Sequence, residues 1–93
     1  MKQRPSKNGK RVRFQVNADP GAEVFVAGTF NSWNPQEFRL KSNGDDTVYV
    51  GVVPVTPGEH EYKFVVNGQW MPDPNNADWR PNDFGSLNSV LRV

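Results

Sequence analysis

The chain of 93 residues contains no cysteine and no long hydrophobic run. Without cysteine, disulfides and thiolate metal sites are excluded, and the composition is compatible with a reducing compartment, so we expect a cytoplasmic protein. No stretch approaches the roughly 20 apolar residues that span a bilayer. The basic N-terminus is not followed by an apolar run, which argues against a signal peptide.

Long helices are unexpected as well, because eight glycines and eight prolines interrupt a chain of single-domain length. Between these turn signals lie short segments rich in β-branched and aromatic residues, typical of strands. We predict a turn at 54–58, a long polar loop at 72–85, and strands at 11–16, 23–29, 37–41, 47–53, 59–66, 69–71 and 86–93. About seven short strands at this spacing indicate an all-β fold, an immunoglobulin-like antiparallel β-sandwich.

The net charge of +1 conceals an uneven distribution along the chain. Six of the eleven basic residues lie within the first 13 positions, where there is no acid, and the remainder has five basic and ten acidic residues. We interpret residues 1–10 as a flexible basic tail and 11–93 as the folded module. Nucleic-acid or anionic-surface binding is the alternative, but the tail lacks interleaved aromatics and the body is acidic. We therefore expect neither a nucleic-acid nor a membrane partner.

The segment 59–66 predicts a strand with two different faces. One face carries His60, Tyr62, Phe64 and Val66, and the other carries Glu59, Glu61, Lys63 and Val65. Burial of the aromatic face would turn the charged face outward. The Asn67-Gly68 pair that follows is typical of a type I′ hairpin, which would hold Trp70 close to Lys63.

Two tryptophans have polar neighbours where a core would not require them. Trp33 lies in a loop before Pro35, and Trp70 follows the hairpin turn. An indole surrounded by hydrogen-bonding groups matches a sugar, which has C–H bonds on its ring faces and hydroxyls at its rim. The pair therefore favours a carbohydrate-binding module over two core tryptophans. Trp79 has three open interpretations: a cap on the core edge, a stack on Arg80, or a third platform.

Two polar residues also have alternative interpretations. Lys63 is either a donor to sugar hydroxyls or a member of a weak cross-strand ion pair. Asn88 lies in the last strand, where an amide needs a partner, which is either a loop backbone or a ligand.

Catalysis is not expected. Glycoside hydrolysis uses two carboxylates, and Glu59 and Glu61 share a strand face, but they are predicted to be exposed without an apolar pocket. The loop acids are interpreted as caps and turn formers, and His60 as a packed residue. The sequence has no phosphate loop, nucleophile elbow or metal-ligand cluster, so we predict no enzyme activity, no metal and no cofactor.

The segments 24–33, 58–64, 67–70 and 73–74 closely resemble family 48 carbohydrate-binding modules. This family includes glycogen-binding domains of AMP-activated protein kinase β subunits and N-terminal domains of branching and debranching enzymes, and the likeness runs from about Arg11 to Val93. The resemblance implies an early-set immunoglobulin-like sandwich that binds α-1,4-glucans. It also implies that Trp33 and Trp70 stack on glucose and that Lys63 donates to hydroxyls. The implied contacts late in the chain are Phe84, where leucine is expected, Ser86 and Asn88.

Together these features predict non-catalytic binding of α-1,4-glucans: glycogen, starch, maltooligosaccharides and cyclodextrin. Two indoles set at an angle suit a curved α-1,4 chain better than a flat β-1,4 chain. One alternative is a protein-interaction module that recruits or regulates a kinase or glycogen-metabolising enzyme. Another is a truncated appendage of a glucan-active enzyme.

Overall fold

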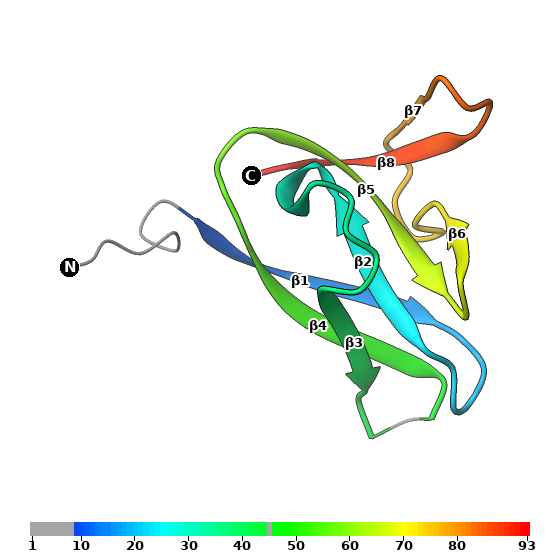
Figure 1. Ribbon diagram of the computed structural model, residues 1–93. Helices are drawn as coiled ribbons and strands as arrows, with labels where there is room; N and C mark the ends of the chain where they lie inside the picture. The colour runs from blue at the N-terminus through cyan, green and yellow to red at the C-terminus, as the bar shows by residue number, and fades with distance from the viewer. Residues whose placement is uncertain (1–8, 45) are drawn as a thin grey trace.

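The computed structural model describes residues 9–44 and 46–93, and Figure 1 shows their arrangement as strands with a single short 3₁₀ turn, η2. The elements are β1 (Lys10–Asn17), β2 (Val24–Gly28), η2 (Thr29–Asn31), β3 (Phe38–Ser42), β4 (Val48–Val55), β5 (Glu59–Val66), β6 (Gln69–Met71), β7 (Trp79–Pro81) and β8 (Leu87–Arg92). Strands β1 and β5 largely alternate β-branched or aromatic residues with polar ones, β2 and β4 are almost wholly apolar, and glycine, proline or asparagine occupies most of the connections.

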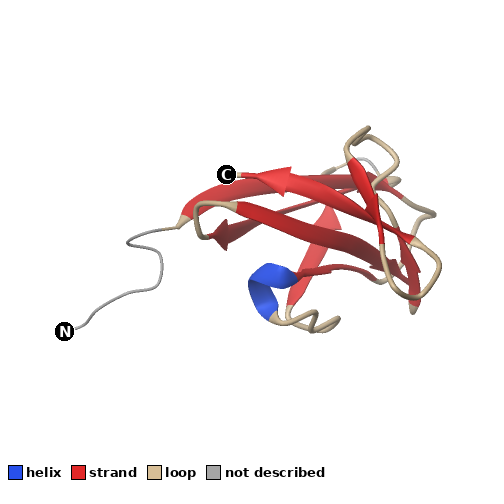
Figure 2. Ribbon diagram, turned by 90° about the horizontal axis from the view of Figure 1, so that it is seen from above, coloured by secondary structure: helices blue, strands red, loops and turns tan. Residues whose placement is uncertain are grey.

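All strand pairs are antiparallel, in the order β1-β4-β3-β2-β5-β8-β7, with β6 also paired to β5. Strand β3 joins the two halves of this order, because its first part pairs with β2 while Lys41 and Ser42 pair with β4. The sheet therefore curls on itself and its two halves lie as layers, as Figure 2 shows. This architecture confirms the predicted all-β antiparallel sandwich.

The core lies between these layers and is built from the inward faces of the strands. The Phe14 ring from β1 meets the rings of Tyr62 and Phe64 from β5 edge-on, at centroid distances of 5.1 and 6.3 Å. Tyr62 Oη donates to Asp73 Oδ2 at 2.7 Å and accepts from Asn76 Nδ2 at 3.1 Å. Burial, together with this bond to Asp73, raises the pKa of the Tyr62 phenol. The hydroxyl of Tyr62 thus connects the loop after β6 to the core through two hydrogen bonds.

Three sequence expectations need correction. Strand β4 ends at Val55, two residues into the predicted turn at 54–58. Pro54 fits there because the pairing of β3 with β4 involves only Tyr49 and Val50, so that β4 pairs only with β1 at Pro54. The predicted loop 72–85 contains the short strand β7. Lys10 belongs to β1 rather than to the predicted tail, and residues 1–8 of that tail lie outside the described residues.

Strand β5 organises the region where the candidate residues meet. Strand β2 covers one of its edges, whereas the other edge is shared: residues 59–62 pair with β8 and residues 64–66 pair with β6. Lys63 stands between these two pairings. In Figure 1, β6 and the β7–β8 hairpin accordingly lie on the same side of the molecule.

Among the described residues, no helix is long and apolar enough to cross a membrane.

Candidate functional site

Trp70 is placed by the tight turn between β5 and β6. Asn67 and Gly68 both have positive φ, 50° and 83°, as the predicted type I′ turn requires. The turn sets Trp70 opposite Val65, on the face of β5 that also carries Lys63. The indole is 44% exposed, so one part is packed and another part faces solvent.

Trp33 is held by an unusual turn after β2. Ser32 and Trp33 both adopt left-handed backbone conformations, with φ of 57° and 60°, which is uncommon for a bulky residue. Trp33 N donates to Gly28 O at 2.9 Å. The Asn31 side chain fixes the turn from within, because its Oδ1 accepts from Gly28 N and its Nδ2 donates to Asn34 O, each at 3.0 Å. The backbone strain is thus balanced by a set of local hydrogen bonds.

The indoles of Trp33 and Trp70 lie next to each other. Their ring centroids are 6.4 Å apart and the ring planes are inclined by 46°. Trp33 is half-buried and comes from the turn after β2, whereas Trp70 comes from β6. The pair therefore forms two neighbouring apolar surfaces set at an angle.

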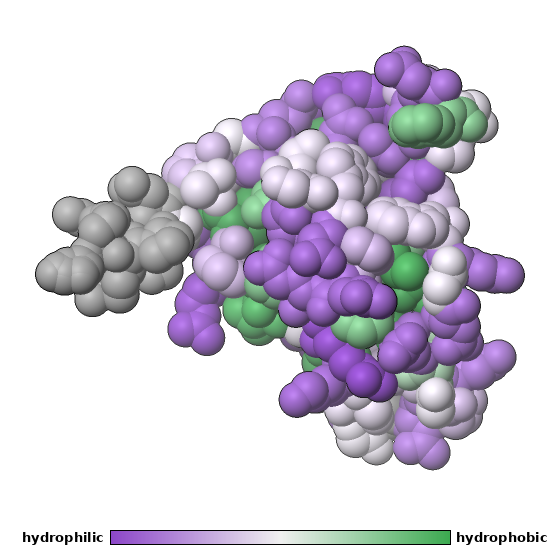
Figure 3. Space-filling view, in the orientation of Figure 1, coloured by the Kyte–Doolittle hydropathy of each residue, from purple (hydrophilic) through white to green (hydrophobic). Residues whose placement is uncertain are grey.

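The end of the β7–β8 hairpin forms the opposite wall. Its tip is organised by Asn82, whose Oδ1 accepts from the backbone N–H groups of Phe84 at 2.9 Å and Ser86 at 3.2 Å. The Phe84 side chain is 94% exposed. Figure 3 shows apolar surface at the outer end of this hairpin, surrounded by hydrophilic surface. An exposed phenyl group on an ordered turn is available for contact with a ligand.

The sequence predicted Lys63 on an exposed face. In the structure, Lys63 is instead buried, with only 8% exposure. Val65 on the same face is also buried, with Trp70 of β6 as its cross-strand neighbour. The Lys63 ammonium donates to Ser86 Oγ at 2.5 Å, which is a partner different from the acids of the ion-pair interpretation. The charged end of Lys63 thus lies inside the site, tied to its opposite wall.

Asn88 is also buried, with 8% exposure. Its Nδ2 donates to Glu61 Oε1 at 2.8 Å, and its Oδ1 accepts from Asn82 Nδ2 at 3.0 Å. Both partners are side chains. The sequence had offered a loop backbone or a ligand as the partner of this amide.

These groups surround an open hollow of about 430 Å³. The structure brings all six residues proposed from the sequence to its lining, and adds Asn82. The lining consists of Trp33, Lys63, Trp70, Asn82, Phe84, Ser86 and Asn88. Sequence reasoning placed Asn82 in a polar loop, although Asn three residues before Gly85 is a turn signal that would have marked it.

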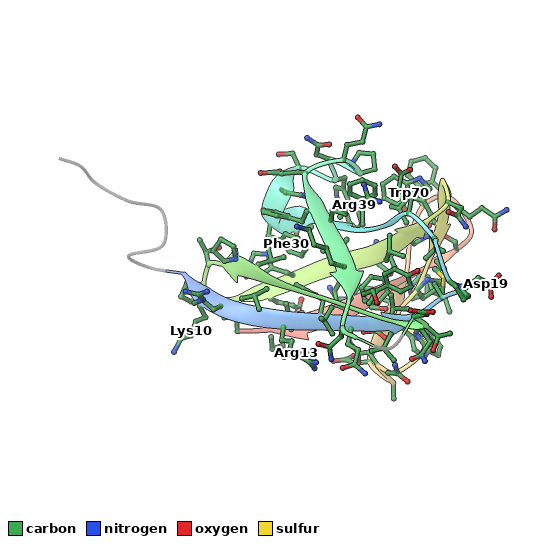
Figure 4. The ribbon with its side chains drawn as sticks, turned by 90° about the horizontal axis from the view of Figure 1, so that it is seen from below. Lys10, Arg13, Asp19, Phe30, Arg39 and Trp70 are labelled. Atoms are coloured by element: carbon green, nitrogen blue, oxygen red, sulfur yellow. The ribbon has the colours of Figure 1, made fainter. Side chains whose placement is uncertain are left out.

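The basic residues of β1 do not line the hollow. Figure 4 shows Lys10 and Arg13 on β1, well apart from Trp70. Trp79 on β7 is 54% exposed, which argues against a cap on the core edge, and it does not line the hollow, which argues against a third platform there.

The remaining candidates are paired within the protein. His60 is half-buried, with Nδ1 3.0 Å from Thr29 Oγ1 and Nε2 2.9 Å from Thr56 O, as expected for a packed histidine. Arg80 forms ion pairs of 3.0 Å with both Glu59 and Glu61. In the described part of the chain, no three His, Cys, Asp or Glu side chains are grouped to hold a metal ion.

The hollow combines apolar ring faces with one ammonium, one hydroxyl and two amides. Such a surface is chemically complementary to an uncharged molecule that has apolar faces and many hydroxyls.

Comparison with known proteins gives this surface a context. Residues 11–93 match the family described as the glycogen recognition site of AMP-activated protein kinase. The chain is 36% identical over 76 residues to the 5'-AMP-activated protein kinase subunits beta-2 of Mus musculus and Homo sapiens, covering 82% of this chain. It is 33% identical over 73 residues to subunit beta-1 of Sus scrofa, covering 78% of this chain and 56% of that relative.

The chain spans about a quarter of the beta-2 relatives, 27% and 26% of their lengths. The family match, in contrast, extends over nearly all of this chain and includes every residue that lines the hollow. The chain therefore belongs to the family of the glycogen recognition site of AMP-activated protein kinase.

Proposed function

We propose that this domain binds α-1,4-glucans without modifying them, with Trp33 and Trp70 stacking on glucose rings. Glycogen, starch, maltooligosaccharides and cyclodextrin all present this linkage. The observation that carries the proposal is the indole pair, inclined by 46° at a centroid distance of 6.4 Å beside the hollow. Membership of a glycogen recognition family supports the same ligand class.

The inclination of the rings is the reason to favour α-linked chains. An α-1,4 linkage turns the chain at every glucose, so that neighbouring ring faces are inclined to each other. A β-1,4 chain is extended and flat, and it would fit coplanar platforms better. Two tilted indoles on separate elements therefore favour a curved glucan.

The polar lining supplies hydrogen bonds at the rim of the sugar. The Lys63 ammonium has three N–H donors, of which one is directed to Ser86. Ser86 Oγ accepts from both Lys63 and Asn82, which leaves its own proton for a sugar oxygen. Phe84 adds apolar contact from the opposite wall. Because the hollow is open, bound hydroxyls keep much of their hydration, and we expect weak to moderate affinity.

The proposal of binding without catalysis is supported by the state of the carboxylates. A glycosidase needs one carboxyl that keeps its proton near neutral pH. The hydrogen bond and charge of Arg80 instead lower the pKa of Glu59. Glu61 is occupied by both Arg80 and Asn88.

Titration with sugars tests this function directly. Maltoheptaose and β-cyclodextrin should change the tryptophan fluorescence and shift backbone amide NMR signals near Trp33 and Trp70. Cellohexaose, a β-1,4 oligosaccharide, is the matched control and should cause neither change. Equal responses to both linkages, or no response to either, would contradict the proposal.

A second proposed function is association with a kinase. The relatives are named as subunits of a kinase, and this chain matches a part of them. Replacing both tryptophans with alanine separates the two roles, because partner binding should persist when glucan binding is lost.

A further inference from the structure

A chain of polar contacts leads from the hollow to the outer surface of β5, β7 and β8. Asn88 Nδ2 donates to Glu61 Oε1 at 2.8 Å, and Arg80 donates to the other oxygen, Glu61 Oε2, at 3.0 Å. We propose that Glu61, held by Arg80, is a positioning residue that fixes which way the Asn88 amide faces the glucan. This inference rests on the proposed function, since it concerns how the same site presents one of its polar groups.

The side-chain amide of Asn88 has two distinguishable ends. The oxygen and NH₂ ends of Asn88 are nearly equal in size but opposite in hydrogen-bonding character. An ionised carboxylate only accepts, so Glu61 selects the NH₂ end. Asn82 Nδ2 donates to the other end at 3.0 Å, so it selects the oxygen. The two neighbours therefore enforce the same orientation from opposite sides.

Reversing the amide would be costly at this position. It would set Asn88 Oδ1 against the Glu61 carboxylate and its NH₂ against the NH₂ of Asn82. Since Asn88 is only 8% exposed, water does little to relieve these repulsions. In the observed orientation, one N–H and one oxygen lone pair of Asn88 remain for sugar hydroxyls.

The strand register explains why Arg80 takes part. Arg80 lies directly opposite Asn88 in the β7–β8 pair, so both side chains lie on the same face as Glu61. The Arg80 side chain is 44% exposed and that of Glu61 is 25% exposed, so the ion pair by itself adds little stability. Its effect is to hold one carboxylate oxygen of Glu61, which leaves the other oxygen for Asn88.

Glu59 provides a matched control within the same network. It lies on the same strand face and pairs with the same nitrogen of Arg80, also at 3.0 Å. None of the hydrogen bonds of Asn88 described above involves Glu59. Glu59→Gln and Glu61→Gln therefore remove one charge each from the same ion-pair cluster, but only the second changes a neighbour of Asn88.

The consequence of Glu61→Gln follows from the fixed donors around it. The Arg80 guanidinium requires the oxygen of the new Gln side chain, which turns the Gln NH₂ toward the NH₂ of Asn88. The Asn88 amide must then either reverse, which sets its NH₂ against the NH₂ of Asn82, or lose its hydrogen bond to residue 61. We expect Glu61→Gln to weaken maltoheptaose binding about fivefold, the typical effect of one hydrogen bond. We expect Glu59→Gln to leave the affinity unchanged.

Two measurements distinguish positioning from a merely structural effect. In the free protein, the side-chain amide NMR signals of Asn88 should move in Glu61→Gln and stay in place in Glu59→Gln. In a double-mutant cycle, Glu61→Gln should have no further effect on affinity once Asn88 is replaced by alanine. Backbone amide spectra of each variant show whether the fold is retained.

The outcomes separate this inference from the proposed function. If the wild-type domain does not bind maltoheptaose, the proposed function fails and the glucan role of Asn88 fails with it. If the wild type binds and Glu61→Gln binds equally well, only the positioning role of Glu61 is overturned. Additive effects in the double-mutant cycle, or unmoved Asn88 amide signals in the free Glu61→Gln variant, would overturn it as well.

Discussion

Replacing Trp70 with alanine separates stacking from folding. The indole is 44% exposed, so a little over half of its surface is packed against the protein. Truncation to alanine removes roughly 100 Å² of buried apolar area, which corresponds to about 2.5 kcal/mol of folding free energy as an upper estimate. A domain of this size is stable by about 5–15 kcal/mol, so the variant should remain folded.

The effect on glucan binding should be of similar size but more visible. If stacking of a base on an aromatic ring is a fair analogue, one lost contact costs about 1–3 kcal/mol, or roughly a 5- to 150-fold weaker affinity. Isothermal titration with maltoheptaose measures this loss, and urea denaturation of the same sample measures stability.

Two control substitutions make the assignment refutable. Trp79→Ala removes a tryptophan of comparable exposure, 54%, that does not line the hollow, and should leave the affinity unchanged. Phe64→Ala removes a fully buried ring and should cost about 3–5 kcal/mol of stability. The assignment of Trp70 to stacking is refuted if Trp70→Ala binds like the wild type, if Trp79→Ala loses as much affinity, or if Trp70→Ala unfolds while Phe64→Ala is harmless.

Gly28→Ala should lower the free energy of unfolding by about 1–3 kcal/mol or more, because its Cβ would lie 2.5 Å from the Glu61 carbonyl oxygen; an unchanged urea midpoint would count against this packing. Since Arg80 lowers the pKa of Glu59, their ion pair stabilises the fold above the ordinary Glu59 pKa of 4.5, and this contribution is lost as the pH falls through the lower folded value. The stability difference between the wild type and Glu59→Gln, followed by denaturation across this range, should therefore shrink on acidification rather than grow. Deleting residues 1–9, which precede β1, should change neither the melting temperature nor the maltoheptaose affinity; a large drop in melting temperature would show that they contribute to folding.

The local features of the site could be predicted from the sequence. Alternation along β5 predicted that Tyr62 and Phe64 are buried, and the Asn67-Gly68 pair predicted the turn that places Trp70. These signals depend on neighbours within a few residues. The side of the strand on which Trp70 lies then follows from the pairing geometry.

What the sequence did not predict depends on contacts between distant segments. Lys63 is buried where β6 and β8 share one edge of β5, and its ammonium contacts Ser86 at the end of the β7–β8 hairpin. Strand β7 was missed because it has three residues and ends in proline, which is typical of a loop. Asn82 is different, because its partners Phe84, Ser86 and Asn88 lie within six residues, and its turn signal would have indicated the hairpin tip.

The apolar and polar groups of the site are expected to contribute differently to glucan binding, and this difference limits the expected affinity. Trp70 and Phe84 have apolar surface in contact with water, so we expect that covering this surface would drive binding of the proposed glucan. The polar groups are different, because Lys63, Ser86 and Asn88 already have partners in the free protein. A sugar hydroxyl therefore adds a contact to a group whose direction is fixed, and little side-chain freedom is lost on binding. Stacking should then set most of the binding free energy, while the fixed polar groups select the orientation of the glucan chain.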